Sequence, residues 1–148
     1  MYVTFLTEPN NFMPNVDLAY QHALDRLAAV GFAALTERER DLAVLWQVEA
    51  EVINGGFVHY YSGASGDTAF HAPDALARVG AMGKSAIVCA ANALFGPAGP
   101  PRDRTERLAA VRRLSAQDLA TIDDLEQRYA DDPVDVDELV EGFVGKGN

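Results

Sequence analysis

The sequence of 148 residues contains a single cysteine, Cys89. One thiol cannot form a disulfide within the chain, and it cannot build a zinc site from several cysteines. Cys89 lies between Val88 and Ala90 in a very apolar segment, so we expect an inert thiol in the core. The scarcity of cysteine fits a reducing cytoplasm, which is the location that we expect for this chain.

Long apolar runs are also missing. The longest strongly apolar stretch, residues 85–95, is well short of the roughly 20 residues that a membrane-spanning helix needs. Residues 1–9 carry no positive charge ahead of an apolar run, which argues against a signal peptide. We therefore expect a protein that is soluble and has no membrane partner.

Basic residues are scarce beside acidic ones. The chain has 12 Lys and Arg residues against 22 Asp and Glu, a formal net charge of −10. Residues 115–148 hold ten acidic residues against Arg128 and Lys146, whereas residues 101–114 hold five arginines against Asp103 and Glu106. Phosphates would be repelled, so we expect no direct binding to nucleic acid. A basic partner protein suits this charge, although solubility alone also explains an acidic composition.

The apolar residues recur mostly at helical spacing, and few segments alternate as a strand does. The sequence therefore predicts an all-α fold, a single compact multi-helix domain, with one short strand fitting only at residues 2–6. We expect a leader over residues 1–15, the domain over residues 16–144 and a tail over residues 145–148. The expected helices cover residues 16–31, 36–54, 72–79, 84–95, 104–113, 115–131 and 135–143.

The helix that opens at Thr36 has clear signals at both ends. Thr36 and Glu39 form a capping-box pattern, and Asn54-Gly55-Gly56 suits the end of a helix. Residues 57–61 then form a short helical turn, and residues 62–67 form a loop. The buried stripe of this helix is predicted to comprise Leu42, Leu45, Trp46, Val48, Val52 and Ile53.

Glu49 falls within this stripe and should be partly buried. A buried carboxylate needs hydrogen bonds or a cation. Glu49 could therefore act as a base or ligand beside His59 and Tyr60, in a small-molecule pocket that includes Asn54, or it could brace the interior. The histidines and carboxylates have no metal-ligand spacing, and the glycines lack the lysine of a phosphate-binding loop. We expect no metal, no cofactor and no catalytic residues.

A second candidate site is the acidic end of the chain. Carboxylates three or four residues apart on a helix lie roughly 5–6 Å from each other. A row at that spacing can present negative charge somewhat as a nucleic-acid strand does. The residues of this predicted acidic surface are Asp118, Asp123, Asp124, Asp131, Asp132, Asp135, Asp137, Glu138 and Glu141, with Glu37, Glu39 and Asp41 added if they share its face.

The segment around the glycine pair resembles a known family. Residues 49–61, with Glu49, Asn54, Gly55, Gly56, Phe57, His59 and Tyr60, followed by Ser65 and Gly66, resemble the hallmark of the bacterial DNA-mimic protein family, catalogued as domain of unknown function number 4375. Residues 75–81 and 123–132 resemble two further stretches of that family. The similar region runs from about residue 42 to residue 143. His59 departs from the usual glutamine, and Ser62-Gly63 departs from the usual loop asparagine.

This resemblance implies an all-helical, dimeric domain without known catalysis. It also implies an acidic surface that occupies a helix-turn-helix DNA-binding protein in place of DNA. We therefore expect a protein-interaction domain, with DNA mimicry as its sharpest form. Two alternatives stay open, namely an immunity-type protein that neutralises a basic nuclease and a small-molecule enzyme or binding pocket around Glu49 and His59.

Overall fold

The computed structural model describes residues 14–146, and this part of the chain is all-α. Seven α-helices and two short 3-10 helices follow one another there, without a strand. They are α1 (Pro14–Val30), η3 (Phe32–Ala34), α2 (Glu37–Ser62), η4 (Ala64–His71), α3 (Ala72–Val79), α4 (Met82–Ala93), α5 (Arg104–Arg112), α6 (Ala116–Asp131) and α7 (Val136–Lys146). The all-α prediction is confirmed. The proposed strand over residues 2–6 and residues 1–13 of the leader lie outside the described residues.

The signals for the start of α2 act as the sequence predicts. The Thr36 hydroxyl accepts a hydrogen bond from the Glu39 amide at 3.1 Å, and the Glu39 carboxylate accepts one from the Thr36 amide at 2.9 Å. Two of the free amides at the start of the helix are thereby satisfied. Ile53, however, is 50% exposed, so its predicted burial is wrong. Its neighbour Val52 faces the core, and successive residues of a helix point about 100° apart.

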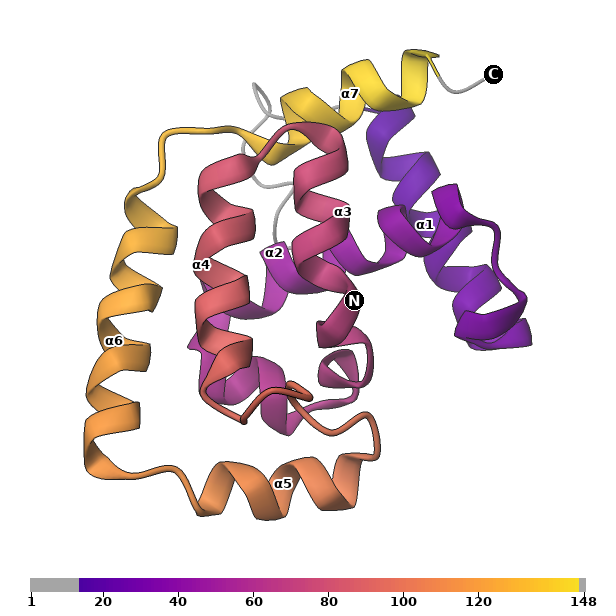
Figure 1. Cartoon of the computed structure of the whole chain (residues 1–148). Helices are drawn as coiled ribbons and strands as arrows, with labels where there is room; N and C mark the ends of the chain where they lie inside the picture. The colour runs from indigo at the N-terminus through magenta and orange to yellow at the C-terminus, as the bar shows by residue number, and fades with distance from the viewer. Residues whose placement is uncertain (1–13, 147–148) are drawn as a thin grey trace.

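The long helix α2 lies at the centre of the molecule, with α3 and α4 in front of it in Figure 1. Helices α5, α6 and α7 follow one another around three edges of this α3–α4 pair, and α1 lies on the remaining side. Helices α5 and α6 contact α2, whereas α7 contacts α1 and α3. The core between these helices contains the fully buried side chains of Leu45, Phe57, Tyr60, Tyr61 and Tyr129.

Helix α4 is mostly apolar, yet only one side of it faces the core. Lys84, Val88 and Ala91 are buried, whereas Met82 is 63% exposed and Cys89 is exposed. The prediction of a core thiol at Cys89 is therefore wrong. Small residues carry little apolar area, so leaving their side of a helix in water costs little.

Candidate functional site

The predicted acidic surface is formed by α6, α7 and the residues that connect them. Nearly all of its carboxylates reach solvent, and only two are half-buried, Asp118 and Asp132. The exposed members are Asp123, Asp124, Asp131, Asp135, Asp137, Glu138 and Glu141. These acids therefore lie along two successive helices, α6 and α7, and the residues that connect them.

Four of these acids also hold the helices in place. Asp118 forms a capping box with Ser115 at the start of α6, and Asp135 accepts from the Glu138 amide at 3.3 Å. Asp132 accepts from the Val134 amide at 3.0 Å. Asp137 accepts from the Tyr20 hydroxyl of α1 at 3.0 Å. These four carboxylates therefore stabilise the fold, independently of any role in binding.

The remaining acids differ in how far they are neutralised. Asp124 pairs with Arg128 at 3.0 Å, one helical turn along α6, and Asp131 accepts from Gln127 at 3.0 Å. Within the described part of the chain, the side chains of Asp123, Glu138 and Glu141 form no hydrogen bond or ion pair. Their charges are therefore the ones most available to a partner.

Of the three α2 acids suggested for this surface, Glu39 and Asp41 are engaged in other contacts, and the exposed Glu37 lies 3.8 Å from Arg78. Asp41 is 1% exposed and accepts hydrogen bonds from Arg78 Nε at 2.7 Å and Arg78 Nη2 at 2.9 Å. His71 Nε2 lies 2.7 Å from the same carboxylate. Glu39 pairs with Arg26 as well as capping α2. The suggestion that Asp41 helps to form the acidic face is wrong, because its carboxylate is buried and paired with Arg78.

The Asn54-Gly55-Gly56-Phe57 segment forms a kink inside α2. Gly56 has φ 83° and ψ 176°, a conformation that ends the first part of the helix. The Phe57 amide, which starts the next part, donates to Glu126 Oε1 of α6 at 2.7 Å. A Cβ atom on Gly56 would collide with this carboxylate. The glycines thus end a helix, as the sequence indicated, rather than forming a phosphate loop, and they also leave room for Glu126.

Glu49 is an internal brace. Its Oε2 atom accepts hydrogen bonds from Lys84 Nζ of α4 at 3.0 Å and from the Tyr129 hydroxyl of α6. The Lys84 ammonium also lies 4.7 Å from the centre of the Tyr129 ring, a favourable cation–π distance. Glu49 therefore joins three helices. The sequence did not reveal Lys84 as its partner, although a lone lysine on an apolar helix is a signal for such pairing.

Glu49 and His59 do not form a pocket together. His59 Nε2 lies 2.7 Å from Glu51 Oε1 on the outside of the molecule, whereas Glu49 turns inward to Lys84. A carboxylate bound inside the molecule and an imidazole paired on its outside are not arranged to share a substrate proton. Within residues 14–146, no three His, Cys, Asp or Glu side chains gather in a way that could hold a metal ion. None of the described helices is long and apolar enough to cross a membrane.

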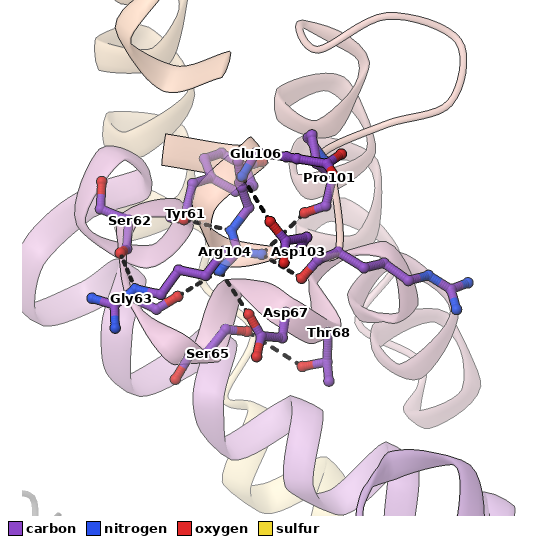
Figure 2. A network of polar contacts seen from close by, with 12 residues as sticks. Tyr61, Ser62, Gly63, Ser65, Asp67, Thr68, Pro101, Asp103, Arg104 and Glu106 are labelled. Atoms are coloured by element: carbon purple, nitrogen blue, oxygen red, sulfur yellow. Dashed lines mark hydrogen bonds and ion pairs between the residues drawn. The ribbon is translucent and has the colours of Figure 1, made fainter. Parts of the chain in front are cut away.

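Ser65 and Gly66 belong to η4, which encloses a buried guanidinium. Arg107 of α5 is 0% exposed and donates to the Tyr61 carbonyl at 2.6 Å, to the Gly63 carbonyl at 2.8 Å and to Asp67 Oδ1 at 2.8 Å. Figure 2 shows this network between η4 and the start of α5. A Cβ atom on Gly66 would lie 2.6 Å from Arg107 Nε. The glycine leaves room for the arginine.

The network of Arg107 also includes the chain ahead of α5. Its Nη1 atom donates to the carbonyls of Pro101 and Arg102 at 3.0 and 2.9 Å. Sequence reasoning missed this role, because Arg107 is one of five arginines in a short stretch and nothing in the pattern separates it from the others. Part of the loop predicted over residues 62–67 instead belongs to the 3-10 helix η4, which supplies Asp67 to the guanidinium.

A groove lies where the kink of α2 faces α6. It encloses about 400 Å³. Its α2 side is formed by Val52, Ile53, Asn54, Gly55 and Gly56, and its α6 side by Asp123, Glu126, Gln127, Tyr129 and Ala130. The pocket that the sequence placed around Glu49 and His59 is thus replaced by a groove that neither residue lines.

Comparison with known proteins identifies the family. The model of the family described as DMP19-like protein matches residues 33–146, most of the chain. This finding corrects the assignment to domain of unknown function number 4375, because the matching family is a named one. Searches of curated proteins and of solved structures found no match. On the extent of the match, this chain belongs to the DMP19-like protein family.

Proposed function

We propose that this chain is a protein-interaction domain whose acidic surface binds a basic protein. The observation that carries the proposal is the exposure of seven carboxylates on α6, α7 and their connection, with Arg128 as the one cation of α6. An array of like charges raises the association rate and the specificity for a partner of opposite charge.

DNA mimicry is the sharpest form of this proposal. With a rise of 1.5 Å per residue, Asp124 and Asp131 are separated by about 10 Å along the axis of α6. A nucleic-acid strand places about three charges over that length. Asp123 and Asp124 at one end and Asp131 and Asp132 at the other imitate part of such a row. The proposed partner is a helix-turn-helix DNA-binding protein, whose groove-facing side is basic.

The test is a capture experiment with a matched variant. The chain and its Asp123/Asp124/Asp131→Asn variant are immobilised, exposed to a lysate at low salt and eluted with a salt gradient. We expect a DNA-binding regulator to elute from the unmodified chain and to be lost from the variant, since screening removes exposed charge interactions.

The identity of the captured protein then distinguishes DNA mimicry from neutralisation of a nuclease. In a gel-shift assay, the chain should displace the regulator from its DNA, and the triple variant should not. Capture of a nuclease, with inhibition of its cleavage, would replace mimicry by the neutraliser alternative. Affinity that does not change between low and high salt would reject the acidic surface in both roles.

We also propose that the chain forms a homodimer through the outer side of α4. Met82, Ala86, Cys89, Ala90 and Ala93 are all exposed and recur at helical spacing along this side. Two such faces could pack closely, because their small side chains allow helices to approach. Sedimentation velocity should show a dimer that Ala90→Glu dissociates, and a monomer in the unmodified chain would contradict the proposal.

A further inference from the structure

The groove between the kink of α2 and α6 has a negative charge that nothing inside the molecule neutralises. Asp123 is exposed at its rim and has no ion-pair partner in the described part of the chain. Glu126 offers one oxygen to the Phe57 amide at 2.7 Å and has no ion-pair partner in the described part of the chain. No Lys, Arg or His is among the residues that line the groove. A cation entering it therefore meets no competitor.

The backbone of α2 adds to this potential. Gly56 interrupts the helix, so Val52, Ile53, Asn54 and Gly55 form the last turn of its first part, and all four line the groove. The carbonyl end of a helix carries roughly half a negative charge and favours cations. The carboxylates of α6 and the helix end of α2 thus face the same space from opposite sides.

Ile53 gives the groove an apolar side. It is 50% exposed, an unusual position for isoleucine beside a polar recess. The stem of a long basic side chain buries its methylene groups against such a surface while the charged head reaches polar groups. Carboxylate oxygens and backbone carbonyls match the planar donor fork of a guanidinium better than the point charge of an ammonium.

We propose that this groove is a binding site for an arginine side chain of the basic partner, with the guanidinium between Asp123, Glu126 and the end of the first part of α2 and its stem against Ile53. The inference rests on the proposed function, because the groove would be the part of the acidic surface that recognises one specific side chain of the partner. The rest of the surface attracts basic proteins by charge alone, whereas the groove selects arginine over lysine.

The experiment compares two neighbouring aspartates. Asp123 lines the groove and Asp124 does not, so Asp123→Asn and Asp124→Asn change the net charge equally and differ in position. Binding of a hexa-arginine peptide and a hexa-lysine peptide to the full chain and to each variant is measured by calorimetry at low salt. Thermal melts of the three proteins check that each is folded, as expected for exposed side chains.

We expect the unmodified chain to bind the arginine peptide more tightly than the lysine peptide. Asp123→Asn should lower the affinity for the arginine peptide about tenfold, the loss typical of one charge-assisted hydrogen bond. Asp124→Asn should weaken it less than about twofold, because an exposed ion pair contributes little. Backbone amide signals of residues 53–56 should shift on addition of N-acetylarginine amide and return to their free positions in Asp123→Asn.

Two results would contradict the proposal that the groove binds an arginine side chain. Equal weakening by both variants would show that the peptide senses only net charge, and equal affinity for the two peptides would show that no guanidinium is selected. Either result leaves the acidic surface and its salt-dependent partner intact. Conversely, a selective loss of arginine-peptide binding in Asp123→Asn, combined with a lysate that yields no basic protein eluting with salt, would keep a groove that binds arginine and reject the proposed function.

Discussion

Two carboxylates of α2 and two of α6 and α7 are alike in chemistry and opposite in position. Asp41 and Glu49 of α2 face inward, where Arg78 and Lys84 neutralise them. Asp123 and Glu141 of the last two helices remain in water. Burial without a partner costs several kcal/mol, so a buried acid needs a cation close by, whereas an exposed one does not. Charge count alone therefore cannot separate braces from binding residues.

The largest expected effect comes from the buried arginine. Arg107→Ala leaves the carbonyls of Tyr61, Gly63, Pro101 and Arg102 without their donor, and should reduce the free energy of unfolding by about 3–5 kcal/mol. Urea denaturation followed by circular dichroism measures it. Arg107→Lys, which keeps the charge and loses the planar fork, should recover only part of the loss.

The matched control for Arg107 is Arg112, which is exposed on the same helix. Arg112→Ala should stay within about 0.5 kcal/mol of the unmodified protein. If Arg107→Ala and Arg112→Ala had the same effect, the contrast between interior and surface charges would not hold for α5.

Two glycines with the same backbone conformation provide the next comparison. Gly31 has φ 82° and ψ 162°, close to the values of Gly56, but nothing lies within 4 Å of the place for its Cβ. Gly31→Ala should therefore cost only the backbone strain, of order 1–3 kcal/mol. Gly56→Ala should cost clearly more, because it also displaces Glu126. Equal melting temperatures in the two variants would show that Glu126 moves without loss.

The contacts of Asp41 predict that the folded protein loses stability as the pH falls. Burial would raise the pKa of its carboxyl, but hydrogen bonds from His71 and Arg78 outweigh that effect and lower the pKa below its usual value. An acid with a lowered pKa in the folded state stabilises the fold above its unfolded pKa of about 4, and this contribution is lost as the pH falls through the folded value.

Asp41→Asn should accordingly cost about 2–3 kcal/mol at pH 7, the value of charged hydrogen bonds. It should also flatten the acid limb of a plot of unfolding free energy against pH, measured by urea titrations between pH 3 and 7. A variant whose acid limb matches that of the unmodified protein would show that Asp41 does not titrate with unfolding.

Substitution of Asp137 should change the stability least, because the pKa of its carboxyl is shifted in the direction opposite to that of Asp41. Partial burial raises the pKa of its carboxyl, Tyr20 opposes this by a hydrogen bond, and Glu49, Asp135 and Asp17 add repulsion. A raised pKa means a stabilising contribution that is present below the unfolded pKa and is lost as the pH rises through the folded value. Asp137→Asn, which can still accept from Tyr20, should therefore be neutral or stabilising by less than about 1 kcal/mol at pH 7. Destabilisation by more than this amount in a thermal melt would contradict the assignment.

Much of the helical architecture was predictable from local signals. The capping pair at Thr36, the helix start at Ser115 and the break at Gly56 depend on neighbours in the chain, and the structure confirms each of them. Predictions about which side of a helix is buried were less secure. Ile53 and Cys89 were both assigned to the core, and both are exposed. An apolar helix has no polar face to mark its outer side, so its neighbours decide.

The sequence by itself determined the helices, the acidity of the chain's end and the end of a helix at the glycine pair. Those properties arise from residues close together in the chain. Only the tertiary structure decided that Glu49 pairs with Lys84, that Arg107 enters the centre of a carbonyl network and that Glu126 completes the kink at Gly56. Each of these contacts joins residues 35–69 positions apart, and a charge carries no mark in the sequence of the partner that packing will bring to it.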